Sequence, residues 1–387
     1  MLFISSKKPF PIQDGASIRT MQMYRMLSQF YDVELLYVCS DKKGAGITSV
    51  EQLGVKSCKG FYLPKWKSLG QTMLALFSKA PLQCAYFHSK ELDKHLRSSI
   101  DSYDCVFCNN IRTASYVADN TKVLRWIDFV DAISMNYKGA ASKHGFPMSI
   151  VYREEARRLL NMELNLVNTF DKALIISDVD SSYILKNLTS PTKGISVIPN
   201  SVDIPDETIT QSEGHNLVFV GSMFYDPNII AVSKFAAHVF PLVLKKYPDT
   251  KFYIVGNRPA KKVRRLASDN IIVTGFVNDP KDYLRKSNIV VAPMYSGAGV
   301  QNKILEAMAM GCCVVTTSIG AEGLGPVVSG ESIVIEDDYE KMADKIISLL
   351  SDKNLCQKIG TNARQYVTER FSYDRVFQGF SEQVIDK

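Results

Sequence analysis

The chain has little that is typical of membrane-spanning, metal-binding or disulfide-stabilised proteins. No apolar run reaches the roughly 18 residues that a membrane span needs. The five histidines show no metal-ligand spacing, and the N-terminus lacks the charged region and long apolar core of a secretory signal. Eight cysteines are scattered without a framework, as in proteins of a reducing compartment. We therefore expect a cytoplasmic protein.

One cysteine pair has the CxxC spacing of metal and redox sites. Cys105 and Cys108 lie in a strand-like run, where a three-residue offset places the two thiols on opposite faces. No second pair completes a zinc site, and no DxD motif ends a strand-like run. We therefore expect neither metal ligands nor an essential divalent ion.

Length and charge bound the remaining possibilities. A chain of 387 residues favours two domains, and a hydrophobic content of 46% is enough for sizeable cores. The net charge of +6 fits anionic substrates or an anionic membrane surface and is too weak to indicate nucleic acid.

Strand-like and helix-like segments alternate along the chain, which predicts an α/β fold with doubly wound sheets. A helix is expected over 229–246. The polar stretch 205–216 lacks periodicity, and the pattern restarts at residue 217. We predict an N-terminal domain over 1–198, a linker over 199–216, a C-terminal domain over 217–368, and a final helix over 369–387 that crosses back to the first domain.

The most informative segment, 295–311, reads YSGAGVQNKILEAMAMG and lies between two apolar strand-like runs. Gly297 and Gly299 allow close approach of the backbone to a ligand, and the following helix begins with free N–H groups. Lys303 and Glu306 share one helix face, opposite an apolar face. This pattern suits a nucleoside diphosphate, with Lys303 on phosphate and Glu306 on ribose. The alternative is a surface ion pair on a helix that covers a sheet.

Glycines Gly221, Gly256 and Gly275 also follow strand-like runs, where ligands of doubly wound sheets bind. With the segment above, several blocks along the chain resemble one family. The blocks are 9–15 (PFPIQDG) with Arg19, 128–131 (DFVD), 152–160 (YREEARRLL), 197–203 (VIPNSVD), 219–223 (FVGSM) with Pro227 and Asn228, 252–256 (FYIVG) and 299–311.

Together they resemble the GT-B glycosyltransferases, and more narrowly the retaining group 1 enzymes (glycosyltransferase family 4) of bacterial exopolysaccharide loci. The resemblance implies two Rossmann-like domains, metal-independent transfer from a nucleotide-diphosphate sugar, and no other cofactor. The implied donor-binding residues are Gly221, Ser222, Arg258, Gly297, Gly299, Val300, Gln301, Lys303 and Glu306.

The sequence departs from the family pattern at two places. Ala298 stands where the family usually has a glutamate that contacts the donor sugar, and Ser222 and Met223 stand where Arg and Lys are frequent. Other cations must then meet the diphosphate, and the candidates are Lys303 and Arg258. The alternative for Arg258 is a solvated loop charge.

In the N-terminal domain the candidate catalytic residues are Asp128, Asp131, Gly15 and Arg19. The two aspartates follow a predicted strand, in the region where many relatives place a catalytic histidine. Gly15 would belong to a glycine loop near the transferred sugar. The alternatives are a helix N-cap for Asp131 and a solvated side chain for Arg19.

Residues 61–77 combine Lys65, Trp66 and Lys67 with an apolar helix, so peripheral contact with an anionic membrane is one interpretation. A helix packed beside the sheet is the other. The expected partners are a nucleotide sugar and a glycan or lipid-linked glycan acceptor. Two other functions stay open: a nucleotide-sugar 2-epimerase, which needs no acceptor, and a non-catalytic nucleotide-sugar-binding subunit.

Overall fold

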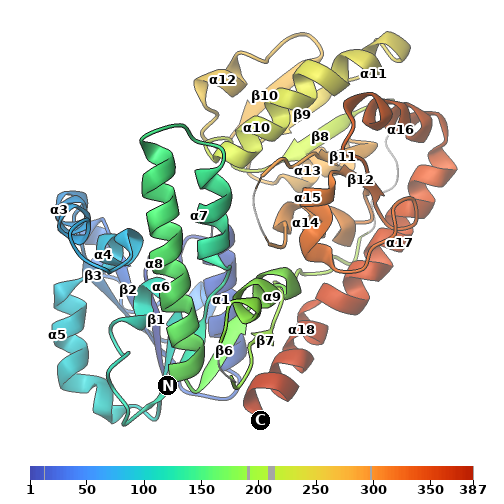
Figure 1. Cartoon of the computed structure of the whole chain (residues 1–387). Helices are drawn as coiled ribbons and strands as arrows, with labels where there is room; N and C mark the ends of the chain where they lie inside the picture. Colours follow the sequence, from blue (N-terminus) through green and yellow to red (C-terminus); the bar gives the residue numbers. More distant parts are fainter. Residues whose placement is uncertain (13, 190–191, 208–213, 297–298, 387) are drawn as a thin grey trace. The chain divides into compact units, whose positions relative to one another are not determined.

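The computed structural model describes residues 1–12, 14–189, 192–207, 214–296 and 299–386. The chain divides into two compact units (Figure 1). The first contains Met1–Pro199 and Gly379–Lys387, and the second contains Asn200–Gln378. Each unit is a parallel sheet with helices packed on it, so the doubly wound α/β prediction is confirmed.

The first unit is built on a seven-stranded parallel sheet in the order β3-β2-β1-β4-β5-β6-β7. The chain starts in the middle at β1, builds one side, and then crosses to β4 to build the other. The point of reversal therefore lies between β1 and β4. The strands are β1 Leu2–Ser5, β2 Glu34–Cys39, β3 Ser57–Tyr62, β4 Cys105–Asn109, β5 Leu124–Asp128, β6 Lys172–Ile175 and β7 Ser196–Val197.

Helices connect these strands, as parallel strands require. The helices α7 and α8 pack side by side (Figure 1). The helices are α1 Gly15–Leu27, α2 Lys42–Ala45, α3 Lys65–Ala75, α4 Leu82–Phe87, α5 Lys90–Ser99, α6 Ile111–Ala114, α7 Ile133–Ala141, α8 Met148–Thr169 and α9 Asp178–Lys186.

The second unit has a six-stranded parallel sheet in the order β10-β9-β8-β11-β12-β13, with its point of reversal between β8 and β11. The strands are β8 Leu217–Val220, β9 Phe252–Val255, β10 Ile271–Gly275, β11 Ile289–Ala292, β12 Cys313–Thr316 and β13 Val334–Ile335. The helices are α10 Asp226–Lys234, α11 Phe240–Lys246, α12 Lys261–Arg264, α13 Lys281–Arg285, α14 Asn302–Ala309, α15 Ser318–Ala321, α16 Tyr339–Ser351, α17 Lys353–Phe371 and α18 Tyr373–Phe380.

The helix expected over 229–246 is interrupted by a π-helical stretch, Phe235–Val239, between α10 and α11. Pro241 follows at once. Proline lacks the N–H that a regular helical turn needs, and its ring crowds the preceding turn, so a local change of hydrogen bonding is expected there.

This same segment corrects the expectation that no part of the chain is apolar enough for a membrane span. Asp226–Lys246 forms a 21-residue helical segment with a mean hydropathy of 1.4 over its most apolar window. Val232, Phe235, Val239 and Val243 from it are buried in the core of the second unit. The composition of the segment is therefore explained by its packing inside the protein.

The boundaries between the units differ from the predicted ones. Residues 200–207 of the predicted linker pack with the second unit. There Val202 pairs with Ser372, and Arg364 of α17 donates a 3.1 Å hydrogen bond to the carbonyl of Glu207. Residues 208–213 lie outside the described residues. The chain joins the first unit again at Gly379, ten residues later than the predicted 369.

The CxxC cysteines lie in the buried strand β4, and all eight cysteines are free and buried. Burial raises the pKa of Cys105 and of Cys108 to about 12, so neither thiol is ionised near neutral pH. The described residues contain no group of three or more metal-binding side chains.

A buried carboxyl on α8 makes folding sensitive to pH. Glu163 is fully buried and accepts hydrogen bonds from the backbone N–H and the hydroxyl of Ser134, the second residue of α7. Burial raises the pKa of Glu163 to about 7, above its usual value of 4.5. The folded state therefore binds a proton more tightly than the unfolded state, and this contribution to stability is lost as pH rises from about 4.5 to about 7.

We predict that Glu163→Gln removes this dependence. Relative to the variant, the wild type should lose on the order of 3 kcal/mol of unfolding free energy between pH 4.5 and pH 8. Urea unfolding at several pH values would measure it. Glu154→Gln on the same helix is the control, because hydrogen bonds from Arg157 and Arg158 lower the pKa of Glu154 to about 2. Parallel curves for wild type and Glu163→Gln would contradict the prediction.

Candidate functional site

In the second unit Lys303 and the loop before it lie at the point of reversal of the sheet. Phe219 belongs to β8, Met294 follows β11, and the segment from Gly299 leads into α14. The amino group of Lys303 lies 5.8 Å from the ring centre of Phe219 and 3.8 Å from the sulfur of Met294. Lys303 therefore bridges the carboxyl ends of the two strands between which such sheets bind ligands.

The N-terminus of α14 has no side-chain cap among the described residues. Its N-cap residue, Gln301, makes no side-chain capping bond, and its side-chain oxygen accepts a 2.9 Å hydrogen bond from the amino group of Lys303 instead. An uncapped N-terminus leaves N–H groups and a positive dipole end available for an anion. Lys303 thus adds a cation to this end of the helix.

The loop before α14 depends on two glycines. Gly299 has a φ of 77°, which side-chain-bearing residues rarely adopt. Gly323, in the 3₁₀ turn Glu322–Leu324, packs against it: a Cβ on Gly323 would lie 2.6 Å from the carbonyl carbon and oxygen of Gly299 and from the Cα of Val300. Val300 itself is buried. Gly297 and Ala298 lie outside the described residues.

Lys303 and Glu306 have unusual electrostatic surroundings. Burial lowers the pKa of Lys303 to about 8, and the carboxylate of Glu306 opposes this shift. The pKa of Glu306 is raised because neighbouring protein atoms displace water from it, while Lys281 and Lys303 act in the opposite direction. No ion pair joins Lys303 and Glu306 among the residues that the structure describes. A simple surface pair, the alternative interpretation, is therefore wrong.

Close packing of backbone marks the ends of β8 and β9. A Cβ on Gly256 would lie 1.7 Å from the carbonyl oxygen of Gly221, and a Cβ on Gly221 would meet the side chain of Asn228. Asn228 donates to the carbonyl of Ser222, and the hydroxyl of Ser222 donates to Asn257. These contacts fix the turn after β8.

Arg258 follows this edge of the sheet with a φ of 49°, an uncommon value for a residue with a side chain. Its guanidinium lies 5.7 Å from the ring centre of the exposed Phe224 and makes no ion pair with any described carboxylate. The structure therefore leaves Arg258 available to an anion near the β8 and β9 ends, and its role as a phosphate ligand stays a prediction.

In the first unit Arg19 and Asp128 form a buried ion pair. Nε of Arg19 donates to Asp128 at 2.7 Å and Nη2 donates at 3.1 Å, and both side chains are at most 1% exposed. Nη1 of Arg19 also donates to the carbonyls of Ile198 and Pro199 at 2.7 and 3.2 Å. A solvated Arg19 is therefore wrong. The buried pair fixes the position of both side chains, and their predicted catalytic role stays a prediction.

The pair holds a strained turn after β5. Asp128 accepts a 3.1 Å hydrogen bond from the backbone N–H of Val130, whose φ is 68°. A β-branched residue in this conformation costs on the order of 1–3 kcal/mol and persists only where surrounding contacts enforce it. The next residue, Asp131, is partly exposed.

Asp131 is the titratable group of this turn. Part of its surface stays accessible, but neighbouring protein atoms displace most of the water around the carboxyl. This loss of water, with the carboxylates of Asp180 and Asp128, raises the pKa of Asp131 to about 7, against the opposing effect of Arg19 and Arg112. The helix that follows has Ala132 as its N-cap, with no side-chain capping bond, so the N-cap alternative for Asp131 is wrong.

Gly15 is the first residue of α1, directly after the N-cap Asp14. The carboxylate of Asp14 accepts a 2.8 Å hydrogen bond from the backbone N–H of Ser17. Gly15 is exposed. Because α1 already has a side-chain cap, its N-terminus offers less to an anion than that of α14.

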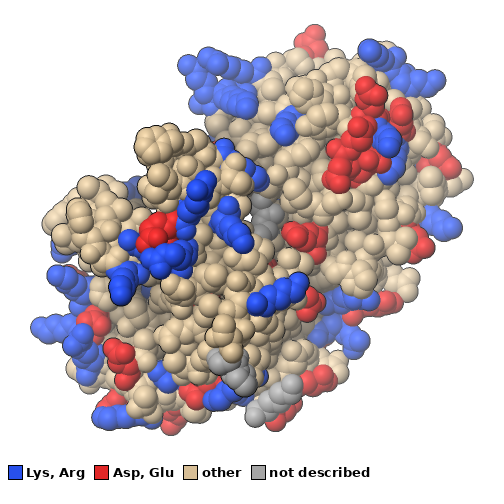
Figure 2. Space-filling view, viewed as in Figure 1, with Lys and Arg blue, Asp and Glu red and all other residues tan. Residues whose placement is uncertain are grey.

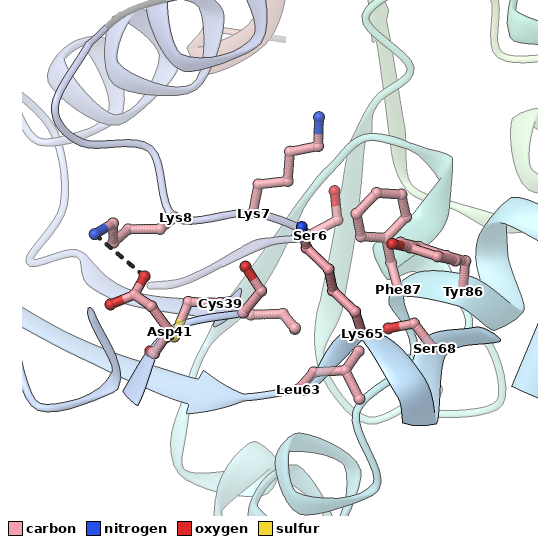
Figure 3. Close-up of a pocket in the computed structure, with 12 residues that line it drawn as sticks. Ser6, Lys7, Lys8, Cys39, Asp41, Leu63, Lys65, Ser68, Tyr86 and Phe87 are labelled. Atoms are coloured by element: carbon pink, nitrogen blue, oxygen red, sulfur yellow. Dashed lines mark hydrogen bonds and ion pairs between the residues drawn. The ribbon is translucent and has the colours of Figure 1, made fainter. Parts of the chain in front are cut away.

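A basic cavity of about 450 Å³ opens beside the carboxyl ends of β1, β2 and β3 (Figure 3). Lys7 and Lys8 line it after β1, and Lys65 lines it from α3. Phe87 from α4 forms another wall. Lys8 lies 3.6 Å from Asp41, whereas Lys7 has no ion pair among the described residues.

Lys7 and Arg112 are functional candidates that the sequence did not indicate. The guanidinium carbon of Arg112 lies 4.7 Å, and the Lys7 amino group 5.7 Å, from the ring centre of Phe87. Burial and then the charge of Arg112 lower the pKa of Lys7. Lys7 follows β1 and Arg112 follows β4, so both lie at the point of reversal. Both residues follow predicted strands, which is a signal that the sequence contains. The sequence does not show that these two strands are neighbours in the sheet, so it could not bring the two residues together.

Comparison with known proteins agrees with this geometry. Residues 214–352 match the family model of the glycosyl transferases group 1. Over 400 residues and 99% of both chains, the sequence is 25% identical to an uncharacterized 44.6 kDa protein in the cps region of Klebsiella pneumoniae. Through residues 214–352, which lie in the second unit, the chain matches the group 1 glycosyltransferases.

Other relatives match a smaller part of the chain or are similar to it in fold alone. The capsular polysaccharide biosynthesis glycosyltransferase CapM of Staphylococcus aureus is 26% identical over 148 residues, which are 36% of this chain and 38% of CapM.

Two solved structures are similar over the whole chain. Sucrose-phosphate synthase from Thermosynechococcus elongatus has a TM-score of 0.73 at 15% identity, with coverage of 100% and 98%. Anabaena Alr3699/HepE in complex with UDP has a TM-score of 0.69 at 16% identity, with coverage of 100% and 99%. They show that the fold is GT-B.

We predict that Gly323→Ala displaces the glycine loop. The added Cβ would overlap Gly299, and relief of this overlap should cost about 1–3 kcal/mol of unfolding free energy. Amide hydrogen exchange should become faster at residues 299–303. Gly139→Ala is the control, because Gly139 has no atom near its Cβ position and its φ is not positive. Unchanged exchange at 299–303 in Gly323→Ala would contradict the packing.

Proposed function

We propose that this group 1 glycosyltransferase transfers a sugar, with retention of configuration, from a nucleoside-diphosphate sugar to an acceptor of bacterial surface-polysaccharide synthesis. The observation that carries the proposal is the open N-terminus of α14, with Lys303 folded over it between β8 and β11. The cps-region and capsule relatives support the surface-polysaccharide context.

The donor would bind the second unit through its diphosphate and its ribose. The N–H groups before α14, the amino group of Lys303 and the guanidinium of Arg258 would contact the phosphates. Glu306, one turn after Lys303, would accept hydrogen bonds from ribose hydroxyls. The structure of Alr3699/HepE, which contains UDP, supports a uridine nucleotide as the first donor to try.

These groups would also lower the barrier to transfer. When the bond between sugar and diphosphate breaks, the departing diphosphate gains negative charge. Preorganised N–H groups and cations directed at this charge stabilise the transition state. Because protein groups can supply this stabilisation, we propose that the reaction needs no divalent ion.

Asp131 is the candidate catalytic residue of the first unit. Positive charge develops on the sugar as the glycosidic bond breaks. We propose that the ionised carboxylate of Asp131 stabilises this charge, with its position set by the Arg19–Asp128 pair and the turn at Val130. The cavity that Lys7 and Lys65 line would receive an acceptor that carries phosphate.

A panel of nucleoside-diphosphate sugars would test the donor site, with binding and slow release of nucleoside diphosphate as readouts. We expect one donor to bind. Lys303→Met should weaken it roughly 10- to 100-fold through loss of charge-assisted hydrogen bonds. Glu306→Ala should weaken it about tenfold. A chelator should leave turnover unchanged.

Lys358→Met, which removes an exposed lysine on α17, is the control for a change of net charge and should bind like the wild type. Conversion of the donor alone to a second nucleotide sugar would instead identify an epimerase. Donor binding without hydrolysis or transfer in the presence of acceptor extracts would identify a non-catalytic subunit.

We predict that transfer by the wild type rises with pH through about 7, where Asp131 loses its proton. Asp131→Asn should lower kcat about 100-fold or more and remove this rise from the pH profile of kcat. Asp101→Asn is the control: hydrogen bonds from Lys122 and Asn120 lower the pKa of Asp101, so it stays ionised over this range. A profile of Asp131→Asn that keeps the rise would contradict the assignment.

A further inference from the structure

The helix α3 and the turn after it carry large apolar side chains on the outside. Trp66 is 70% exposed, Leu74 75% and Phe77 92%. At 100° per residue these three lie within about 80° of one another on the helix. The side toward the protein instead carries the small buried residues Ser68 and Ala75. A helix that only covers the sheet would have the opposite arrangement, so the packed-helix interpretation of this segment does not explain it.

A second group of exposed apolar side chains lies in the same unit, at the start of α8. Phe146 before α8 is 83% exposed, and Met148 and Ile150 in the first turn of α8 are 46% and 56% exposed. The two elements are neighbours, because Arg158 of α8 donates a 2.9 Å hydrogen bond to the carbonyl of Ala75 in α3. Figure 2 shows projections without charged atoms over α3 and over the α7–α8 connection, with basic side chains and an acidic patch next to them.

The unpaired charges around these side chains are positive, and the partly exposed Glu154 of α8 is neutralised by Arg157 and Arg158. Residues 61–80 contain Lys65, Lys67 and Lys79 and no acidic residue. Residues 138–151 contain Lys138 and Lys143 and again no acidic residue. Protein–protein interfaces are depleted of lysine, whereas exposed aromatic residues flanked by lysines are typical of surfaces that enter anionic membranes.

A groove adjoins α3 with the same chemistry. Its volume is about 860 Å³, and it lies between α3, α4 and α8. Leu74, Pro81 and Met162 give it apolar walls, and Lys79 and Lys90 line it without an ion pair to any described residue. The apolar walls fit the part of a lipid acyl chain nearest the head group, and the unpaired lysines fit the lipid phosphate.

We propose that α3, residues 142–151 and this groove dock the first unit onto an anionic lipid bilayer. Trp66, Leu74 and Phe77 would enter the boundary between head groups and acyl chains. Lys79 and Lys90 would contact lipid phosphates in the groove. This surface is separate from the donor residues of the second unit, so the proposal does not depend on the identity of the donor.

Sedimentation of the full chain with vesicles tests the proposal. The wild type should bind vesicles of phosphatidylglycerol and phosphatidylcholine at low salt, and less strongly at high salt or with phosphatidylcholine alone. The triple variant Trp66→Ser, Leu74→Ser, Phe77→Ser should lose binding at least tenfold. Phe276→Ser is the matched control, because Phe276 is 73% exposed in the second unit and should leave vesicle binding unchanged.

A charge variant separates the role of the groove. Lys79→Glu with Lys90→Glu should lower binding to the anionic vesicles several-fold and leave the weak binding to phosphatidylcholine unchanged. Thermal unfolding of each variant would show that both units remain folded. A failure of the wild type to bind any nucleotide sugar would count against the proposed function alone.

Two results would overturn the membrane proposal. The first is a wild type that does not sediment with anionic vesicles, or that binds no better than the triple variant. The second is a wild type that forms dimers in light scattering without vesicle binding and becomes monomeric in the triple variant. That result would assign the apolar surface to contact between copies of the chain.

Discussion

The buried pair of Arg19 and Asp128 is the interaction on which the first unit's functional edge depends. Removing two charges from water is costly, and the cost is offset only when the hydrogen-bonding capacity of both groups is used. Here the guanidinium donates to the carboxylate twice and to two backbone carbonyls, and the carboxylate also accepts from Val130. The pair thereby joins α1, the end of β5 and the chain leaving β7.

This arrangement explains how a strained turn is stable beside the candidate catalytic carboxyl. Val130 alone would avoid a φ of 68°. Its N–H is held by Asp128, and its carbonyl accepts a 3.1 Å hydrogen bond from the backbone of Ile176. The second unit positions its backbone by close packing instead. At Gly221, Gly256 and Gly323 a Cβ would collide with neighbouring atoms, and Gly256 and Gly299 have a positive φ. One unit positions its site by charge and the other by close packing.

Much of this architecture could be predicted from the sequence, because it depends on local patterns. The alternation of strands and helices gave the fold class, and the segment around Lys303 and Glu306 indicated its strand–loop–helix structure. What could not be predicted depends on contacts between distant residues. Arg19 and Asp128 are 109 positions apart, and Lys7 and Arg112 meet only because β1 and β4 are neighbours in the sheet. The outward apolar face of α3 is likewise hidden in the sequence, since periodicity does not say which side faces water.

The return of the last residues to the first unit affects how the chain can be divided. Val384 is fully buried, its carbonyl accepts a hydrogen bond from Lys172, and the amino group of Lys172 lies 4.7 Å from the ring centre of Trp126. A gene fragment that stops at residue 199 would leave this part of the first unit uncovered. A fragment that contains the complete first unit would need residues 1–199 joined to residues 379–387 by a short artificial linker in place of the second unit.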